Sequence, residues 1–210
     1  PQLIGRIIAL SNSLRPYRYL NGDSLVGREI SPERGSLLLA IVSSEIDKSS
    51  LRRIYRAADF SFADLKKAVL SGEYLAGINL VAADLKGARL DGTDLSNANL
   101  SEAELGDAVL AGANLQDARL RNSKMNKTSL GFADLSRANL SGADLQRANL
   151  SSSVLQNAHL TNANLAGANL SRAIFSKAEL DYVNLDSAIV AEFDWLVSLS
   201  RLETDTLRGT

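Results

Sequence analysis

The chain of 210 residues contains no cysteine and one histidine, His159. Without cysteine there are no disulfides, no thiolate metal sites and no cysteine nucleophile. A single imidazole cannot build a histidine-rich metal site. The nucleotide-binding motifs G-x-x-x-x-G-K-[ST] and G-x-G-x-x-G are also absent. We therefore expect no metal, no cofactor and no catalytic residues in this chain, which predicts that it is not an enzyme.

The chain also lacks a large net charge and long apolar runs. Lys and Arg number 23 and Asp and Glu 24, for a formal net charge of −1, so we expect no nucleic-acid binding. The longest unbroken apolar run, Leu37 to Val42, is far shorter than the roughly 20 residues of a membrane helix. We expect no membrane contact within this fragment and a cytoplasmic location. Because the chain opens at Pro1 rather than Met, we expect it to be part of a longer protein.

What the sequence does contain is a repeat of five residues. From Phe60 to Val190, every fifth residue is apolar over 27 consecutive positions, and Leu fills 23 of them. Ala occupies 20 of the 27 positions that lie two residues earlier. The residue in between is usually Asp or Asn, as in Ala83-Asp84-Leu85. A register kept over this length indicates one repetitive architecture.

A period of five fits neither a straight helix nor a straight strand. A helix would spread the leucines around its circumference, and a strand would send successive leucines to opposite faces. The period fits a chain that turns a corner once per repeat, with the Ala and Leu side chains inward and the Asp or Asn outward. Four corners close a coil of twenty residues, and stacked coils pair through their backbones at about 4.8 Å.

These A-[DN]-L-x-x units resemble the pentapeptide-repeat family over residues 57–190. The resemblance implies an all-β solenoid, a right-handed quadrilateral parallel β-helix, here of about seven coils. Its structural core along one side comprises residues spaced by twenty: Leu65, Leu85, Leu105, Met125, Leu145, Leu165 and Leu185.

The two flanks lack the period and are expected to cap the tube. Residues 1–56 predict a helical N-terminal cap, with a helix start at Ser31-Pro32-Glu33. Residues 191–210 predict a short C-terminal helix and a tail. In that helix the residues expected to close the last coil are Trp195, Leu196 and Leu199. Resemblance to family members that bind DNA gyrase adds a homodimer through this helix as an alternative.

Two features of the repeat region indicate a partner surface. The stretch from residue 119 to residue 132 holds four basic residues and the exposed-position Phe132; the basic residues are Arg119, Arg121, Lys124 and Lys127. This stretch predicts either contact with an acidic partner or with nucleic-acid phosphate, or a locally imperfect coil in which Met125 fills the interior. Apolar residues at outward positions, Val69 and Val109, indicate a modest contact surface.

The pattern favours a non-enzymatic interaction or scaffold module with an unknown protein partner. One alternative is a DNA-mimicking topoisomerase modulator, as in the quinolone-resistance branch of the family. Residues 57–190 carry 15 acids and 12 bases, a weak charge for a duplex mimic, and no functional loop interrupts them. The pattern is also compatible with a supporting domain of an enzyme whose catalytic part lies elsewhere, and with a soluble accessory domain of a membrane-anchored protein. His159, stacked between Asn139 and Glu179, is expected to be an ordinary surface residue.

Overall fold

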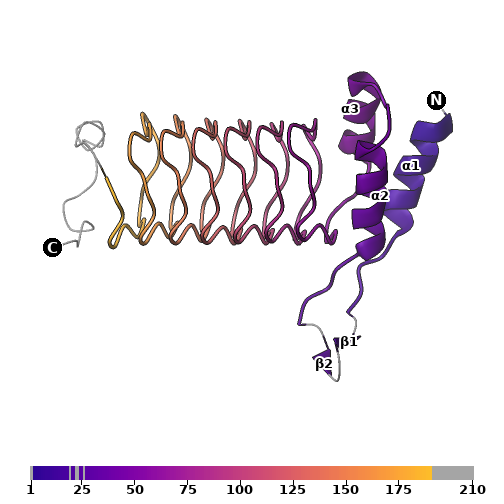
Figure 1. Ribbon diagram of the computed structural model, residues 1–210, viewed down its shortest axis with the longest axis horizontal. Helices are drawn as coiled ribbons and strands as arrows, with labels where there is room; N and C mark the ends of the chain where they lie inside the picture. The colour runs from indigo at the N-terminus through magenta and orange to yellow at the C-terminus, as the bar shows by residue number, and fades with distance from the viewer. Residues whose placement is uncertain (1, 19, 22–23, 26, 191–210) are drawn as a thin grey trace.

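The computed structural model describes residues 2–18, 20–21, 24–25 and 27–190. Three helices lie at the N-terminal end: α1 (Gln2–Ser13), α2 (Pro32–Val42) and α3 (Lys48–Ala57). Between α1 and α2 the chain forms a two-stranded antiparallel hairpin of β1 (Leu20–Asn21) and β2 (Ser24–Leu25). The rest of the described chain winds into a stack of coils that extends away from the helices (Figure 1). Trp195, Leu196 and Leu199 lie outside the described residues.

The coils are joined by parallel bridges between residues twenty apart. In one column Asp64 pairs with Asp84 and Asp84 with Glu104, and three further columns follow the same rule. The Leu65 amide donates to the Asp84 carbonyl at 2.8 Å, and the Asp84 amide donates to the Ala63 carbonyl at 2.9 Å. Each coil therefore contains twenty residues and is hydrogen-bonded to its neighbours.

Four walls surround the coil interior, each marked by one column of bridges. Wall 1 begins at Asp64, wall 2 at Val69, wall 3 at Tyr74 and wall 4 at Asn79, and each continues in steps of twenty residues. Because the chain moves to the next wall after every pentapeptide, residues close in sequence occupy different walls.

A left-handed residue closes every corner between walls. From residue 62 to residue 187, the second of the two residues in each turn has a φ between 53° and 75°. Nineteen of these corner residues are non-glycine and seven are glycine. Where an Asp or Asn precedes the buried Leu, its side chain supports the same corner. For example, Asn114 Oδ1 accepts from the Gln116 amide at 3.2 Å, and Asn169 Oδ1 accepts from the Ser171 amide at 3.1 Å. The short polar residue of the motif thus satisfies a turn amide that would otherwise lack a partner.

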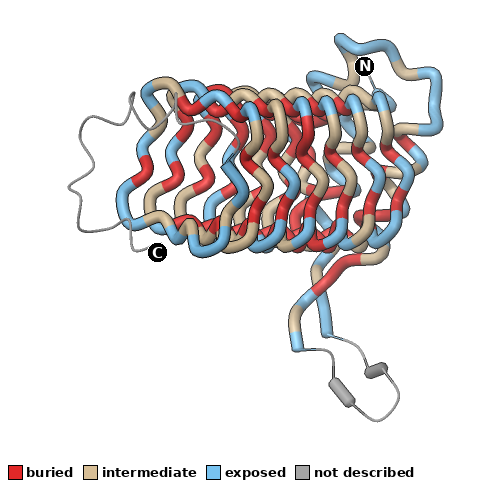
Figure 2. Tube along the Cα trace, turned by 60° about the vertical axis from the view of Figure 1, so that its left-hand side comes forward, coloured by how far each residue is buried: buried red, intermediate tan, exposed pale blue. Residues whose placement is uncertain are grey.

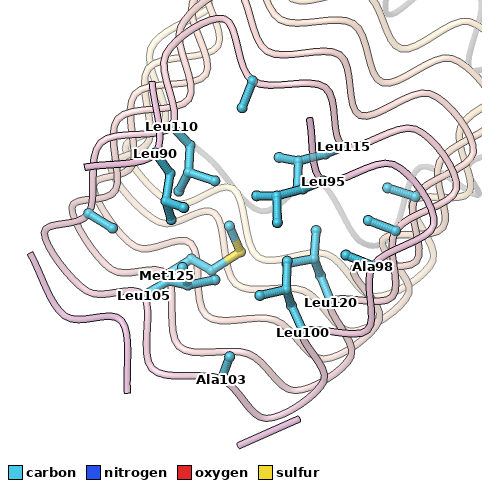
Figure 3. Packing of buried hydrophobic residues seen from close by; sticks show 14 of the residues in the cluster. Leu90, Leu95, Ala98, Leu100, Ala103, Leu105, Leu110, Leu115, Leu120 and Met125 are labelled. Carbon is cyan, nitrogen blue, oxygen red and sulfur yellow. The ribbon is translucent and has the colours of Figure 1, made fainter. Parts of the chain in front are cut away.

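Leucine side chains fill the interior in stacked layers (Figure 3). Buried residues recur at the same places in successive coils (Figure 2). Of the seven residues named above as one side of the core, six are at most 1% exposed: Leu65, Leu85, Leu105, Met125, Leu145 and Leu165. The seventh, Leu185, is only partly buried and belongs to the last described coil. A coil at the end of a stack has a neighbour on one side only, which leaves its core residues more accessible.

Polar residues replace the inward alanine at a few positions, and their hydroxyls are satisfied. Ser123 Oγ donates to the Leu120 carbonyl at 2.7 Å, and Thr128 Oγ1 donates to the Leu105 carbonyl at 2.8 Å. Both residues are fully buried, as is Met125 between them. The interior therefore accepts small hydroxyl groups because each one has a backbone acceptor.

Helix α2 starts where the sequence predicts, and Ser31, just before it, adds one parallel bridge to wall 1. Ser31 caps the helix, its Oγ accepting from the Arg34 amide at 3.3 Å. The Ser31 amide also donates to the Phe62 carbonyl at 2.7 Å, and the Asp64 amide donates to the Ser31 carbonyl at 3.2 Å. The exposed edge of the first coil is thereby paired on this wall, which prevents edge-to-edge association there.

The buried side chain of Arg34 links the helices to the first coil. Its Nη2 pairs with Asp59 Oδ2 at 2.9 Å, and its Nη1 donates to the Ser61 carbonyl and Oγ, both at 2.8 Å. Its Nε donates to the Ser11 carbonyl of α1 at 3.3 Å. One guanidinium thus joins α1, α2 and the start of the repeats, using the forked geometry that distinguishes Arg from Lys.

We predict that Gly35→Ala destabilises the protein, because α2 approaches the first coil most closely at Gly35. A Cβ at this position would lie 2.1 Å from the Asp64 carbonyl oxygen, so helix or coil has to move. Overpacking of this kind costs about 1–3 kcal/mol of unfolding free energy. Urea unfolding followed by circular dichroism measures the loss.

The matched control is Gly5→Ala in α1, where an added Cβ meets nothing within 4 Å. This change is expected to be neutral or to stabilise by up to about 1 kcal/mol, because Ala favours helix over Gly. Equal stability of the Gly35 and Gly5 variants would contradict the close packing of α2 on wall 1.

Candidate functional site

The basic stretch 119–132 does not form a single patch. Arg119 lies on wall 4, Arg121 on the corner between walls 4 and 1, Lys124 on wall 1, and Lys127 on the corner between walls 1 and 2. The chain carries these four residues around half of one coil, so a flat partner on one wall could not contact all of them. The structure supports the second interpretation of this stretch in one respect, since Met125 is buried in the interior.

Lys124 takes part in a charge cluster on wall 1 centred on Glu104. The Glu104 carboxylate lies 2.7 Å from Lys124 Nζ, 2.9 Å from Lys86 Nζ and 3.1 Å from Arg28 Nη1. Stacking by twenties places Lys124 beside Glu104 and could be read from the sequence. The contact of Arg28 could not, because Arg28 lies outside the repeat.

Glu104 is nearly buried and remains charged. Burial raises the pKa of its carboxyl, but the hydrogen bonds from Lys124 and Lys86 outweigh this and lower the pKa from 4.5 to about 2. Arg28 also donates through Nη2 to the Ala82 carbonyl at 2.6 Å. The cluster therefore ties Arg28, three residues after β2, to wall 1.

The outward apolar residues fall into two separate groups. On wall 2, Val69 is 67% exposed and Val109 is partly buried, with Arg89 paired between them. The second group, which we call the apolar strip, comprises Phe132, Val154 and Ile174. Val154 pairs with Ile174 on wall 3, and Phe132 occupies the corner between walls 2 and 3 two residues before Asp134, which pairs with Val154.

Phe132 is the most exposed apolar side chain described, at 74%. It stands at a left-handed corner with φ of 60°, in the same column as Gly72, Gly92 and Gly112. An aromatic residue at this conformation costs energy that glycine avoids.

His159 forms a single surface contact. Its Nδ1 lies 2.7 Å from Glu179 Oε2, and both side chains are about half exposed. Among the described residues no group of three or more His, Asp or Glu side chains could hold a metal ion. Within the same part of the chain, every helix is too short or too polar to cross a membrane.

Sequence reasoning missed a polar hollow on wall 4, beside the C-terminal turn of α3. It has a volume of about 520 Å³ and is bordered by α3 residues together with residues of wall 4 and its corners. Arg119 is the one predicted partner residue that lines it. The signal that could have found it is the column Asn79, Asn99 and Arg119, but the position of α3 above that column is not encoded in the period.

We predict that Glu104→Gln destabilises the protein in a pH-dependent way. Because the folded pKa lies below the ordinary value, the ionised carboxylate contributes stability above about pH 4.5 and loses it as the pH falls towards 2. At pH 7 the loss of charged hydrogen bonds is expected to cost about 1–3 kcal/mol. Urea unfolding of wild type and variant between pH 7 and pH 2.5 measures this, and the difference between them should shrink in acid.

Glu102→Gln serves as the control because Glu102 is exposed at a neighbouring corner. Its stability difference from wild type is expected to stay within about 0.5 kcal/mol at all pH values. A Glu104→Gln difference that does not change with pH would contradict the role of the ionised cluster.

Comparisons with known proteins place these observations in a family. The family model for pentapeptide repeats matches in eight copies over residues 78–117, 113–151 and 153–189, more than half of the chain. Among curated proteins the comparison finds no match.

Several solved structures are similar. A pentapeptide repeat protein from the thylakoid lumen of Arabidopsis thaliana is 28% identical over 50% of this chain and 69% of its own, with a TM-score of 0.43. HetL of Nostoc sp. strain PCC 7120, involved in heterocyst differentiation regulation, is 25% identical over 69% of this chain and 93% of its own, with a TM-score of 0.31. A trypsin-treated form of QnrB1, a plasmid-mediated fluoroquinolone resistance protein, is 21% identical over 67% and 84%, with a TM-score of 0.32.

The repeat of Ala, Asp or Asn, and Leu, the bridges between residues twenty apart and the match of the family model all agree. The chain belongs to the pentapeptide-repeat family and folds as a β-helix solenoid.

Proposed function

We propose that this chain is a non-enzymatic scaffold that binds a protein partner through the apolar strip of Phe132, Val154 and Ile174. The observation that carries the proposal is the exposed aromatic ring of Phe132 at a left-handed corner. The partner is a protein with an apolar recess that can receive this ring.

The energetics of Phe132 support a role in binding rather than in stabilising the fold. A left-handed conformation costs a side-chain-bearing residue about 1–2 kcal/mol, and a ring that is 74% exposed recovers little of this by burial. Glycine occupies the three preceding corners of the column at lower cost. Non-glycine residues are common at these corners, so what marks Phe132 is its exposed ring, and aromatic residues are common at the centres of interfaces.

The surroundings of Phe132 favour close approach of a partner. The corners next to it in the stack carry small residues, Ala111 and Gly112 on one side and Ser151 and Ser152 on the other. No bulky side chain at these corners therefore hinders access to the ring, while Val154 and Ile174 continue the apolar surface along wall 3.

Charge distribution argues against the alternative of DNA mimicry. A duplex mimic needs uncompensated negative charge along its length, and residues 57–190 carry only three more acids than bases. Several of these acids are paired, including Asp84 with Lys66 at 3.3 Å and Asp117 with Arg137 at 2.7 Å. We therefore do not propose topoisomerase modulation for this chain.

We also propose the division of the chain into an N-terminal cap of residues 1–56, a four-sided tube of about seven coils from residue 57 to residue 190, and a C-terminal cap of residues 191–210. The contacts of Ser31 and Arg34 support the first cap. The roles of Trp195, Leu196 and Leu199 as a plug or a dimer contact stay predictions, since these residues lie outside the described ranges.

We predict that Phe132→Gly abolishes partner capture without loss of stability. The protein is immobilised and exposed to lysate of its source organism, and captured proteins are quantified by mass spectrometry. A bound partner is expected to fall at least tenfold with the variant, because a central aromatic contact contributes about 2 kcal/mol or more. The variant's unfolding free energy is expected to stay equal or rise by about 1 kcal/mol.

Tyr182→Gly is the matched control. Tyr182 is 72% exposed and has a φ of 58°, but it stands at the corner between walls 4 and 1. It should retain the partner that Phe132→Gly loses. The proposal is wrong if every protein captured by the wild type is also captured by Phe132→Gly.

A further inference from the structure

The hollow on wall 4 is rich in hydrogen-bond donors without partners. Arg56 at the end of α3 and Arg119 on wall 4 both line it, and neither guanidinium has an ion pair or hydrogen bond to a described residue. Asn99, which also lines the hollow, precedes Arg119 in the wall 4 column and pairs with it. Its Oδ1 already accepts from the Ser101 amide at 3.2 Å and from Ser101 Oγ at 2.8 Å, which leaves its amide nitrogen as a further donor.

The acid that lines the hollow does not neutralise these donors. Asp59 Oδ2 pairs with the buried Arg34 at 2.9 Å, and its Oδ1 accepts from Asn79 Nδ2 at 2.8 Å and from the Ser61 amide at 3.0 Å. Both carboxylate oxygens are therefore occupied within the protein.

Charges next to the hollow are mixed, with an excess of bases. Arg121 stands on the adjoining corner, about one coil from Glu102, whose amide donates to the Arg121 carbonyl at 2.8 Å. On the other adjoining corner Asp117 is held by Arg137, with bonds of 2.8 and 2.7 Å. Helix α3 carries further bases, of which Lys48 and Arg52 contact Tyr74 on wall 3. Asp59 and Asp117 thus have basic partners within the protein, whereas Arg56 and Arg119 have no acidic partner among the described residues.

We propose that the wall 4 hollow binds the carboxylate side chains of a short acidic segment of a partner protein. Forked guanidinium groups bind carboxylates in a bidentate manner, and the Asn99 amide beside Arg119 suits a second oxygen. Successive wall residues are about 4.8 Å apart, so Asn99 and Arg119 can engage neighbouring groups of one segment. This site is separate from the apolar strip and does not depend on it.

The length of the occupant follows from the charge of the whole tube. Residues 57–190 carry 15 acids and 12 bases, so a long polyanion that extended beyond the hollow would meet net repulsion. A short acidic segment contacts only the region where basic groups are unmatched. A nucleic acid is thereby disfavoured, and the experiment includes it as a competing outcome.

Fluorescence anisotropy with a labelled eight-residue peptide of alternating Glu and Gly tests the proposal. The peptide is expected to bind the wild-type chain, and a Gln–Gly peptide of equal length is expected not to. Raising the salt from 50 to 500 mM should weaken binding, since exposed charges are screened. The double variant Arg56→Gln/Arg119→Gln should lower the affinity at least tenfold.

The matched control is Arg147→Gln/Arg172→Gln. Both control arginines are exposed, line no part of the hollow and have no ion pair to a described residue, and the double variant has the same net charge. It should bind the Glu peptide within twofold of wild type, and all variants should keep the wild-type melting temperature because no buried contact is removed.

Three results would overturn the proposal. The first is no binding of the Glu peptide to the wild-type chain. The second is an equal loss of affinity in both double variants, which would assign binding to overall charge. The third is an eight-residue oligothymidylate that displaces the peptide at a lower concentration than unlabelled peptide does, which would make the occupant a nucleic acid. Each result leaves the Phe132 experiment unaffected, because the apolar strip lies on another side of the tube.

Discussion

The structure depends on backbone hydrogen bonds between residues twenty apart. Each Leu amide donates to the next coil, as Leu65 does to Asp84, and each outward residue donates back, as Asp84 does to Ala63. Because one coil is the template for the next, the leucines stack in register and the walls stay straight. The first coil needs a template of its own, and Ser31 supplies it on wall 1 before the chain enters α2.

The five-residue period of the sequence predicts most of the structure of the tube. It predicted which side chains are buried, which residues lie twenty apart on one wall, and why Asp or Asn often precedes the Leu. It could not place residues outside the period: Arg28 against Glu104, Arg34 against Asp59, and the hairpin of β1 and β2 depend on tertiary contacts of a non-repetitive segment. The hollow was missed for the same reason, because it exists only where α3 lies above wall 4.

Linear proximity was misleading in the basic stretch. Arg119, Arg121, Lys124 and Lys127 are neighbours in sequence, yet the corners distribute them around the tube, and Lys124 is neutralised by Glu104. In a coil of twenty residues, the relevant neighbour is the residue one coil away. A functional surface on such a fold is therefore encoded by residues at intervals of twenty, together with the corner residues beside them.

The contact of Arg28 with Glu104 has a consequence for how this chain can change in length. Arg28 lies between β2 and α2, and Glu104 lies two coils beyond Asp64 on wall 1. Adding or removing one pentapeptide before Glu104 would rotate it by a quarter turn and separate the two charges. Beyond Glu104, whole coils can be duplicated or lost with every wall still aligned. The contact therefore fixes the number of repeats between Asp64 and Glu104 and places no such constraint on the repeats that follow Glu104.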